Sequence, residues 1–171
     1  MRDVAARPVD WRAPISYLPR VLLEPRRPML ALAIAWLVVF VPTLALGAIV
    51  SAVMPPSALP TFPAASWYVS LLIVVIGPVI ETLIMGGALI LLSRFLSPTA
   101  AVLVSAAGWG IAHSTAAPGW GLVIWWPFVI FSTLFVTWRK RSTMAAIAMA
   151  ASAHAMHNLL PALMLVSGLE S

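Results

Sequence analysis

Five long apolar runs constrain this chain more than any other feature. They cover residues 29–54, 67–93, 98–117, 119–138 and 143–169. Each has about the length of the roughly 20 consecutive apolar residues that a helix needs to cross a bilayer. Because 62% of the residues are hydrophobic and only 9% are charged, the composition excludes an ordinary soluble globular fold. The sequence therefore predicts an all-α protein, a polytopic membrane helix bundle of about five transmembrane helices.

The basic residues predict how this bundle is oriented. Short loops rich in Lys and Arg stay on the cytoplasmic side of a membrane. With five spans, all ten basic residues fall on one side, because six precede the first span, Arg94 follows the second and residues 139–141 follow the fourth. We expect an integral protein of the bacterial inner (cytoplasmic) membrane, with a cytoplasmic N-terminus and a C-terminus on the outer side. No nucleic-acid partner is expected, because the basic residues are scattered over loops.

Residues 1–28 form a segment of a different kind, since they combine six Arg with five Pro. Such a mixture neither packs a core nor forms a long helix. Its apolar side chains predict an arm that lies along the cytoplasmic interface, and a solvated arm is the alternative. These side chains are Trp11, Tyr17, Leu18, Val21, Leu22 and Leu23. The remaining residues, 29–169, are predicted to form one transmembrane domain in contact with the lipid bilayer.

Four polar residues inside the apolar runs form a candidate site. An ionisable residue at membrane depth costs roughly 2.5–3.5 kcal/mol on insertion scales and therefore indicates a function. At about 1.5 Å per residue, Glu81 and His113 lie about 20 and 24 Å from the cytoplasmic ends of their spans. His154 and Asn158 lie about 18 and 24 Å from the end of theirs, on one face of that helix. Three helices thus bring polar groups to one layer, which predicts a shared site.

Two neighbours of these residues have structural interpretations. His157 is displaced around its helix from Asn158, and we expect it to be an interhelical hydrogen-bond partner. Pro78 has no backbone N–H, so the carbonyl near Val74 lacks its usual helical partner. The helix is therefore expected to be loosened beside Glu81, at a place where protein or water must satisfy the backbone.

The segments around these polar residues resemble the signature motifs of a known family. They read Gly77-Pro-Val-Ile-Glu81-Thr-Leu-Ile-Met-Gly-Gly87, Trp109-Gly-Ile-Ala-His113 and His154-Ala-Met-His-Asn158. In order and spacing they resemble the motifs of the CAAX protease and bacteriocin-processing (CPBP) intramembrane protease family. That family has a Pro, then a Glu-Glu pair with an Arg four residues after the second Glu, an aromatic-x-x-x-His and a His-x-x-x-Asn. The resemblance covers roughly residues 77–158.

The resemblance implies an intramembrane endopeptidase that cleaves a peptide or a membrane-anchored precursor. Glu81 and His113 would activate the attacking water, and His154 and Asn158 would hold the developing oxyanion. The chemistry agrees, because a desolvated carboxylate oriented by an imidazole acts as a general base, and paired donors stabilise a tetrahedral intermediate in a dry site. Whether Zn²⁺ takes part stays open. If it does, its ligands would be Glu81, His113 and His154, with one position left for water.

Two departures from the family pattern keep the enzymatic activity an open question. The second Glu is replaced by Thr82, and the Arg is replaced by Gly86. The alternative is therefore a catalytically degenerate member, a pseudoenzyme that serves as a structural or binding subunit of a larger membrane complex. A third hypothesis is a haem- or metal-binding membrane protein, because His113 and His154 or His157 could ligate an iron axially. A Soret band in the purified protein tests that third hypothesis.

Overall fold

The computed structural model describes residues 15–61 and 66–167, and every regular element within them is helical. The elements, in chain order, are α1 (Arg20–Leu23), α2 (Pro28–Val53), the 3₁₀ turn η1 (Pro56–Ala58), α3 (Trp67–Leu71), the π-helical turn η2 (Leu72–Ile76), α4 (Gly77–Leu92), α5 (Pro98–Ser114), α6 (Pro118–Trp138) and α7 (Thr143–Ser167). The segments α3, η2 and α4 follow one another without a break and form one rod, α3-η2-α4. The predicted all-α class is confirmed.

Four helical stretches in the described residues are long and apolar enough to cross a membrane. They are 28–53, 67–92, 118–138 and 143–167, and each end lies within two residues of a predicted span. The fifth predicted span, 98–117, forms α5, which has 17 residues and ends at Ser114. It ends early because Pro118 disfavours a helical conformation for the residue before it, and Ala117 is extended. The described residues thus contain four candidate spans where five were expected.

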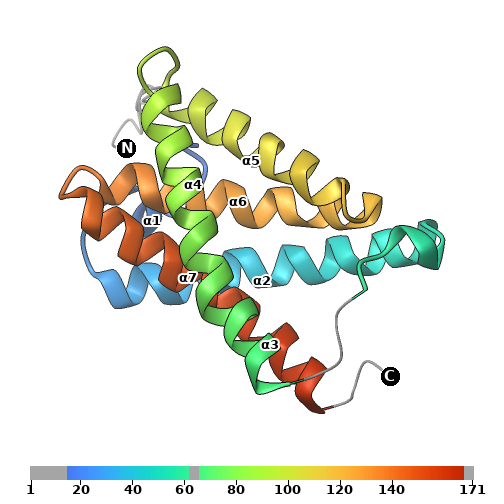
Figure 1. The fold of residues 1–171 in the computed structure, drawn as a ribbon. Coiled ribbons are helices and arrows are strands. Elements are labelled where there is room, and N and C mark those ends of the chain that lie inside the picture. The colour runs from blue at the N-terminus through green and yellow to red at the C-terminus, as the bar shows by residue number, and fades with distance from the viewer. Residues whose placement is uncertain (1–14, 62–65, 168–171) are drawn as a thin grey trace, which may run out of the picture.

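The helix α6 lies at the centre of the bundle. It contacts α2, α4, α5 and α7, and nearly all of its second half is buried. Figure 1 shows α2 running alongside α6, and α4 crossing it. The largest fully buried side chains of the described residues include three aromatic rings on α6, those of Phe128, Phe131 and Phe135. These rings fill the space between the surrounding helices.

The helix α5 approaches α6 closely because glycines face each other across the contact. A Cβ added at Gly121 would collide with the carbonyl oxygen of Gly110 and with the hydroxyl of Ser114. Close backbone approach through small residues is the usual way in which membrane helices pack. This contact fixes the place of α5, and with it the place of His113.

The described part of the N-terminal arm packs on the bundle. Leu22 is fully buried, and α1 contacts α2 and α6. The backbone N–H of Ile15 donates a hydrogen bond of 3.2 Å to Thr99 Oγ1 on α5. Tyr17 is exposed, and Trp11 lies outside the described residues. Protein contacts therefore fasten the end of the arm, while its place along a membrane interface stays a prediction.

Candidate active site

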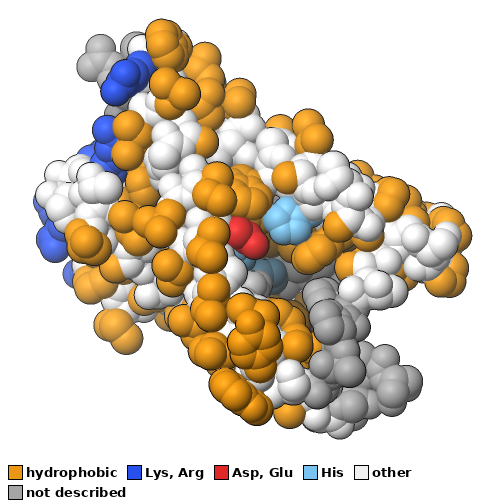
Figure 2. All heavy atoms as spheres, in the orientation of Figure 1, with side chains coloured by type: hydrophobic (Ala, Val, Ile, Leu, Met, Phe, Trp, Pro, Cys, Tyr) orange, Lys and Arg blue, Asp and Glu red, His pale blue; other side chains and the backbone are white. Residues whose placement is uncertain are grey.

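A cavity of about 710 Å³ lies between α2, the rod α3-η2-α4, α5, α6 and α7. All four residues that the sequence assigned to the candidate site line this cavity, and so does His157. In Figure 2, an acidic side chain and histidine side chains lie together in a hollow of a face that is otherwise largely apolar. The structure therefore brings the polar groups of three helices to one place.

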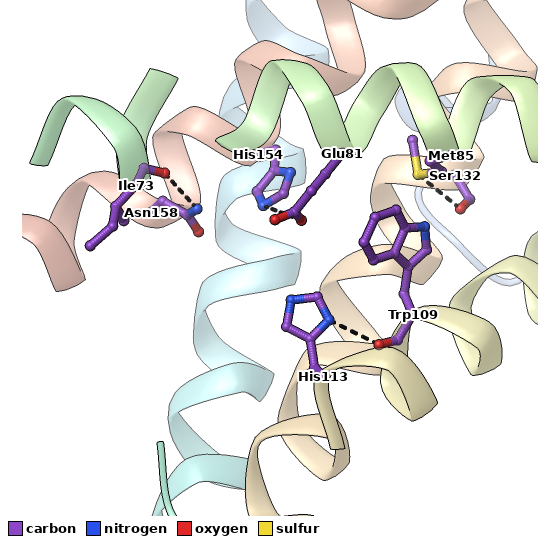
Figure 3. A network of polar contacts seen from close by, with 8 residues as sticks. All are labelled: Ile73, Glu81, Met85, Trp109, His113, Ser132, His154 and Asn158. Carbon is purple, nitrogen blue, oxygen red and sulfur yellow. Dashed lines mark hydrogen bonds and ion pairs between the residues drawn. The ribbon is translucent and has the colours of Figure 1, made fainter. Parts of the chain in front are cut away.

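Glu81 on α4 faces His154 on α7. The distance between Glu81 Oε2 and His154 Nε2 is 3.8 Å (Figure 3), which is too long for a hydrogen bond. The His154 side chain is 7% exposed and the Glu81 side chain 30%. Oε2 itself is enclosed and has no hydrogen-bond partner among the described residues. The carboxylate thus retains an unused acceptor directed at the imidazole.

His113 is held on α5 in one orientation. Its Nδ1 atom lies 2.9 Å from the carbonyl oxygen of Trp109 (Figure 3). Because a carbonyl oxygen only accepts, Nδ1 carries a proton, and in the neutral imidazole Nε2 therefore keeps a lone pair. The ring also packs edge-on against Trp120, with centroids 4.8 Å apart, and in a tilted arrangement against Phe128, with centroids 5.7 Å apart. His113 therefore offers a preoriented acceptor nitrogen in the wall of the cavity.

Two histidines of α7 lie against one phenylalanine of α6. The ring of His154 stacks on Phe131 with centroids 4.6 Å apart, and His157 lies 6.2 Å from the same ring. In both imidazoles Nδ1 is enclosed and has no hydrogen-bond partner among the described residues. We expected His157 to be an interhelical hydrogen-bond partner, but its Nδ1 atom makes no hydrogen bond to the described residues. Sequence reasoning missed it as a cavity residue, although its spacing of three from His154 places both on neighbouring faces of the helix.

Asn158 contacts the backbone of the π-helical turn. Its Nδ2 atom donates a hydrogen bond of 2.9 Å to the carbonyl oxygen of Ile73 (Figure 3). In a π-helix each N–H pairs with the carbonyl five residues earlier, as the glycine after η2 does. Pro78 has no N–H, so the carbonyl left free is that of Ile73. The predicted loss of a partner is thus present, but the π-helical register moves it from Val74 to the preceding residue.

The two departures from the family's first motif are both buried. Thr82 is 1% exposed, and its hydroxyl has no hydrogen-bond partner among the described residues. A Cβ added at Gly86 would lie 2.6 Å from Cε2 of Phe135. The ring of Phe135 therefore occupies the space into which an arginine at this position would extend.

The described residues contain no group of three or more His, Cys, Asp or Glu side chains that could hold a metal ion. The zinc ligand set considered from the sequence, Glu81, His113 and His154, is therefore not formed in this arrangement. Glu81 and His154 face each other between α4 and α7, whereas His113 is bound to the backbone of α5 through one ring nitrogen.

Residues 63–160 match the family model of the type II CAAX prenyl endopeptidase Rce1-like proteins. The matched residues make up more than half of the chain and include Glu81, His113, His154, His157 and Asn158. The chain belongs to this family. The CPBP resemblance of the three motifs is thereby confirmed for this Rce1-like protein. No curated protein and no solved structure matches the chain.

Proposed function

We propose that this Rce1-like protein is an intramembrane endopeptidase that cleaves a peptide or a membrane-anchored precursor. One observation carries the proposal: an unpartnered carboxylate oxygen of Glu81 lies 3.8 Å from His154 Nε2 in the wall of a large cavity. A buried acceptor without a hydrogen bond is costly, and its persistence next to an imidazole supports a role as a base. His113 lines the same cavity with its Nε2 lone pair available.

In the first step, Glu81 takes a proton from a water molecule whose oxygen attacks the carbonyl carbon of the substrate. The Nε2 lone pair of His113 accepts the other hydrogen of this water and so orients it. A carbon–oxygen bond forms, and the carbonyl π electrons move to the carbonyl oxygen, which becomes an oxyanion. His154 stabilises this charge with a proton on Nε2, the ring nitrogen that faces Glu81.

In the second step, the tetrahedral intermediate collapses. The carbon–nitrogen bond breaks and the electron pair of the oxyanion restores the carbonyl. The proton held by Glu81 passes to the departing amine, which regenerates the carboxylate. The products are a carboxylic acid and an amine, and no further reactant is needed.

The rest of the cavity wall supports an apolar substrate. Toward α2 it is lined by Phe40, Leu44 and Val50, and on α6 by Ile124. A wall of this kind binds the apolar part of a peptide or of a membrane-anchored segment by burial of apolar surface. The polar groups at the α4 and α7 side would then meet the backbone of that segment.

A second candidate function is that of a binding or structural subunit of a membrane complex. It is favoured by the first motif, in which Phe135 fills the place of the family arginine beside Gly86, and Thr82 stands in place of the second Glu. The cavity is present although these two positions of the first motif differ from the family pattern. The cavity could then bind a segment of a partner protein without cleaving it.

The test compares membrane peptides and small proteins from cells that carry the native chain, Glu81→Gln or Glu24→Gln. The first variant keeps the shape of the side chain and removes the base, whereas Glu24 is an exposed acid outside the cavity and serves as the matched control. We expect a precursor to accumulate with Glu81→Gln alone. Identical profiles for all three, together with a phenotype of the complete deletion, would favour the binding subunit instead.

A further inference from the structure

The cavity lies in one half of the bundle, away from the basic residues. In the part of the chain that the structure describes, Lys and Arg stand before α2 and in the turns after α4 and α6. They gather at the left of Figure 2, and we call this end of the bundle the basic end. The cavity wall begins at Phe40 on α2 and at His154 on α7, about 18 and 16 Å from the first residues of these helices. On α4 the wall stops at Glu81, about 16 Å before the last residue.

Packed apolar side chains fill the half of the bundle at the basic end. Leu89 on α4, Val102 on α5 and Leu134 on α6 lie within four residues of the helix ends there. Each is 0% exposed and belongs to one hydrophobic cluster. Leu22 of α1 belongs to the same cluster and is also 0% exposed. A polypeptide or a water molecule that approaches from the basic end therefore meets a closed core.

The cavity extends instead toward the other end of the bundle and toward its side. Its wall includes Leu59 and Pro60, which follow η1, and Trp120 in the first turn of α6. Figure 2 views the bundle from the side, since α2 and α6 run across the same view in Figure 1, and acidic and histidine side chains are visible in the hollow. Leu44 lines the cavity and is 56% exposed. The cavity wall therefore continues into the apolar side surface of the bundle.

The wall offers both kinds of contact that a polypeptide segment from a bilayer needs. Such a segment carries mostly apolar side chains, and the wall is apolar at Phe40 and Leu44. Its backbone groups must stay hydrogen-bonded at membrane depth, and the wall carries polar groups at His113, His154 and Asn158. The cavity therefore suits a segment that comes from the bilayer better than a hydrophilic peptide that comes from water.

The basic loops relate this half of the bundle to a side of the membrane. Short basic loops stay on the cytoplasmic side, so the predicted orientation places the cavity in the outer half of the bilayer. We infer that the substrate is a membrane-anchored polypeptide that enters the cavity from the side and is cut in the outer half of the bilayer. Membrane insertion or export must then precede cleavage, and the fragment beyond the cut is released on the outer side. This inference rests on the proposed endopeptidase function and on the predicted orientation.

The first test asks from which side the cavity can be reached, independently of activity. Gly47 on α2 lines the cavity, and nothing lies within 4 Å of a Cβ added there, so Gly47→Cys should fold. Thr43→Cys places a second thiol in the same wall, one turn nearer to the basic end. Both variants are treated with a membrane-impermeant maleimide in right-side-out and in inside-out membrane vesicles. We expect both cysteines to be labelled in right-side-out vesicles and neither in inside-out vesicles.

Ala45→Cys is the matched control for this labelling. Ala45 lies between the two cavity positions on α2 and is exposed, but it is outside the cavity wall and is expected to face lipid. Thiols react as thiolates, which form in contact with water, so this cysteine should stay unlabelled from either side. Labelling of the two cavity cysteines in inside-out vesicles, or in neither kind of vesicle, would overturn the inference.

The second test uses the precursor that accumulates with Glu81→Gln. Moving its flanking Lys and Arg residues from one end of its membrane segment to the other inverts the segment and carries the scissile bond to the cytoplasmic half. We expect the native precursor to be cut, with a new terminus in the outer half of its segment, and the inverted precursor to lose cleavage. A new terminus in the cytoplasmic half, or cleavage of the inverted form at the native rate, would contradict the inference.

Failure of the proposed function can be told apart from failure of this inference. If Glu81→Gln leaves the membrane peptide profile unchanged, the endopeptidase is excluded and its substrate with it, whatever the labelling of Gly47→Cys. If a precursor accumulates with Glu81→Gln but the cavity cysteines are labelled only in inside-out vesicles, the endopeptidase is retained and only its access from the outer half is refuted.

Discussion

The contact between Gly86 and Phe135 leads to a quantitative prediction about the modified first motif. We consider Gly86→Ala, which adds one methyl group where α4 meets α6. The added Cβ would lie 2.6 and 2.7 Å from Cε2 and Cζ of Phe135, about 1 Å closer than the optimum of roughly 3.5–4.0 Å between carbon atoms. Phe135 is 1% exposed, so its ring cannot turn out of the core. Either the ring or the whole helix must move.

The neighbouring Gly87 provides the matched control, because nothing lies within 4 Å of a Cβ added there. Both substitutions gain the same helix propensity, about 1 kcal/mol for Ala over Gly. This term cancels when the two variants are compared. The difference in the free energy of unfolding is therefore the cost of overpacking at Gly86, about 1–3 kcal/mol. Gly86→Ala is expected to be the less stable variant by this amount.

The measurement is unfolding by SDS in mixed micelles, followed by the fluorescence of the eight tryptophans. Gly87→Ala should unfold at an SDS fraction equal to or above that of the native chain, and Gly86→Ala at a lower one. Phe135→Leu should restore part of the loss in the Gly86→Ala background. Equal stability of the two alanine variants would refute the reasoning, because it would mean that α4 and α6 are not packed through Gly86.

The orientation in the membrane is tested with single cysteines, since the chain has none of its own. Ser142→Cys should react with an impermeant maleimide only from the cytoplasmic side. Ser57→Cys should react only from the outer side. The same side for both would contradict the predicted topology. At the contact between α5 and α6, Gly121→Ala should prevent stable folding or lower the unfolding temperature strongly, because its Cβ would collide with the Gly110 carbonyl. Gly108→Ala, with open space around it, should fold normally, and a Gly121→Ala variant of native stability would show that the two helices are further apart.

The long helices could be predicted from the sequence because each forms from one long apolar run, and its length follows from where that run begins and ends. The exception is α5, where the apolar run 98–117 continues for three residues beyond the end of the helix. Pro118 sets the extended conformation of Ala117, and the helix stops at Ser114. At this end of α5, the backbone conformation that a proline imposes on the residue before it outweighs the hydropathy of the run.

The meeting of the polar residues could also be predicted, since depth follows from the rise of a regular helix. The direction in which a side chain points around the helix axis cannot be derived from the helical rise. The direction of Asn158 depends on η2, whose five-residue hydrogen-bond spacing presents the Ile73 carbonyl to α7. The burial of His157 depends on Phe131, a residue of another helix. Both are tertiary effects that no pattern within one helix contains.

The central position of α6 has a consequence for the order in which the bundle assembles during synthesis. Membrane helices insert first and then associate. The hydroxyl of Ser132 on α6 contacts Ser105 Oγ at 3.2 Å and the sulfur of Met85 at 3.3 Å, and both partners lie on helices made earlier. The face of α6 that contacts α7 has no such cover until α7 has left the ribosome. Translation that stops in the turn after α6 therefore leaves one face of this otherwise buried helix in contact with lipid.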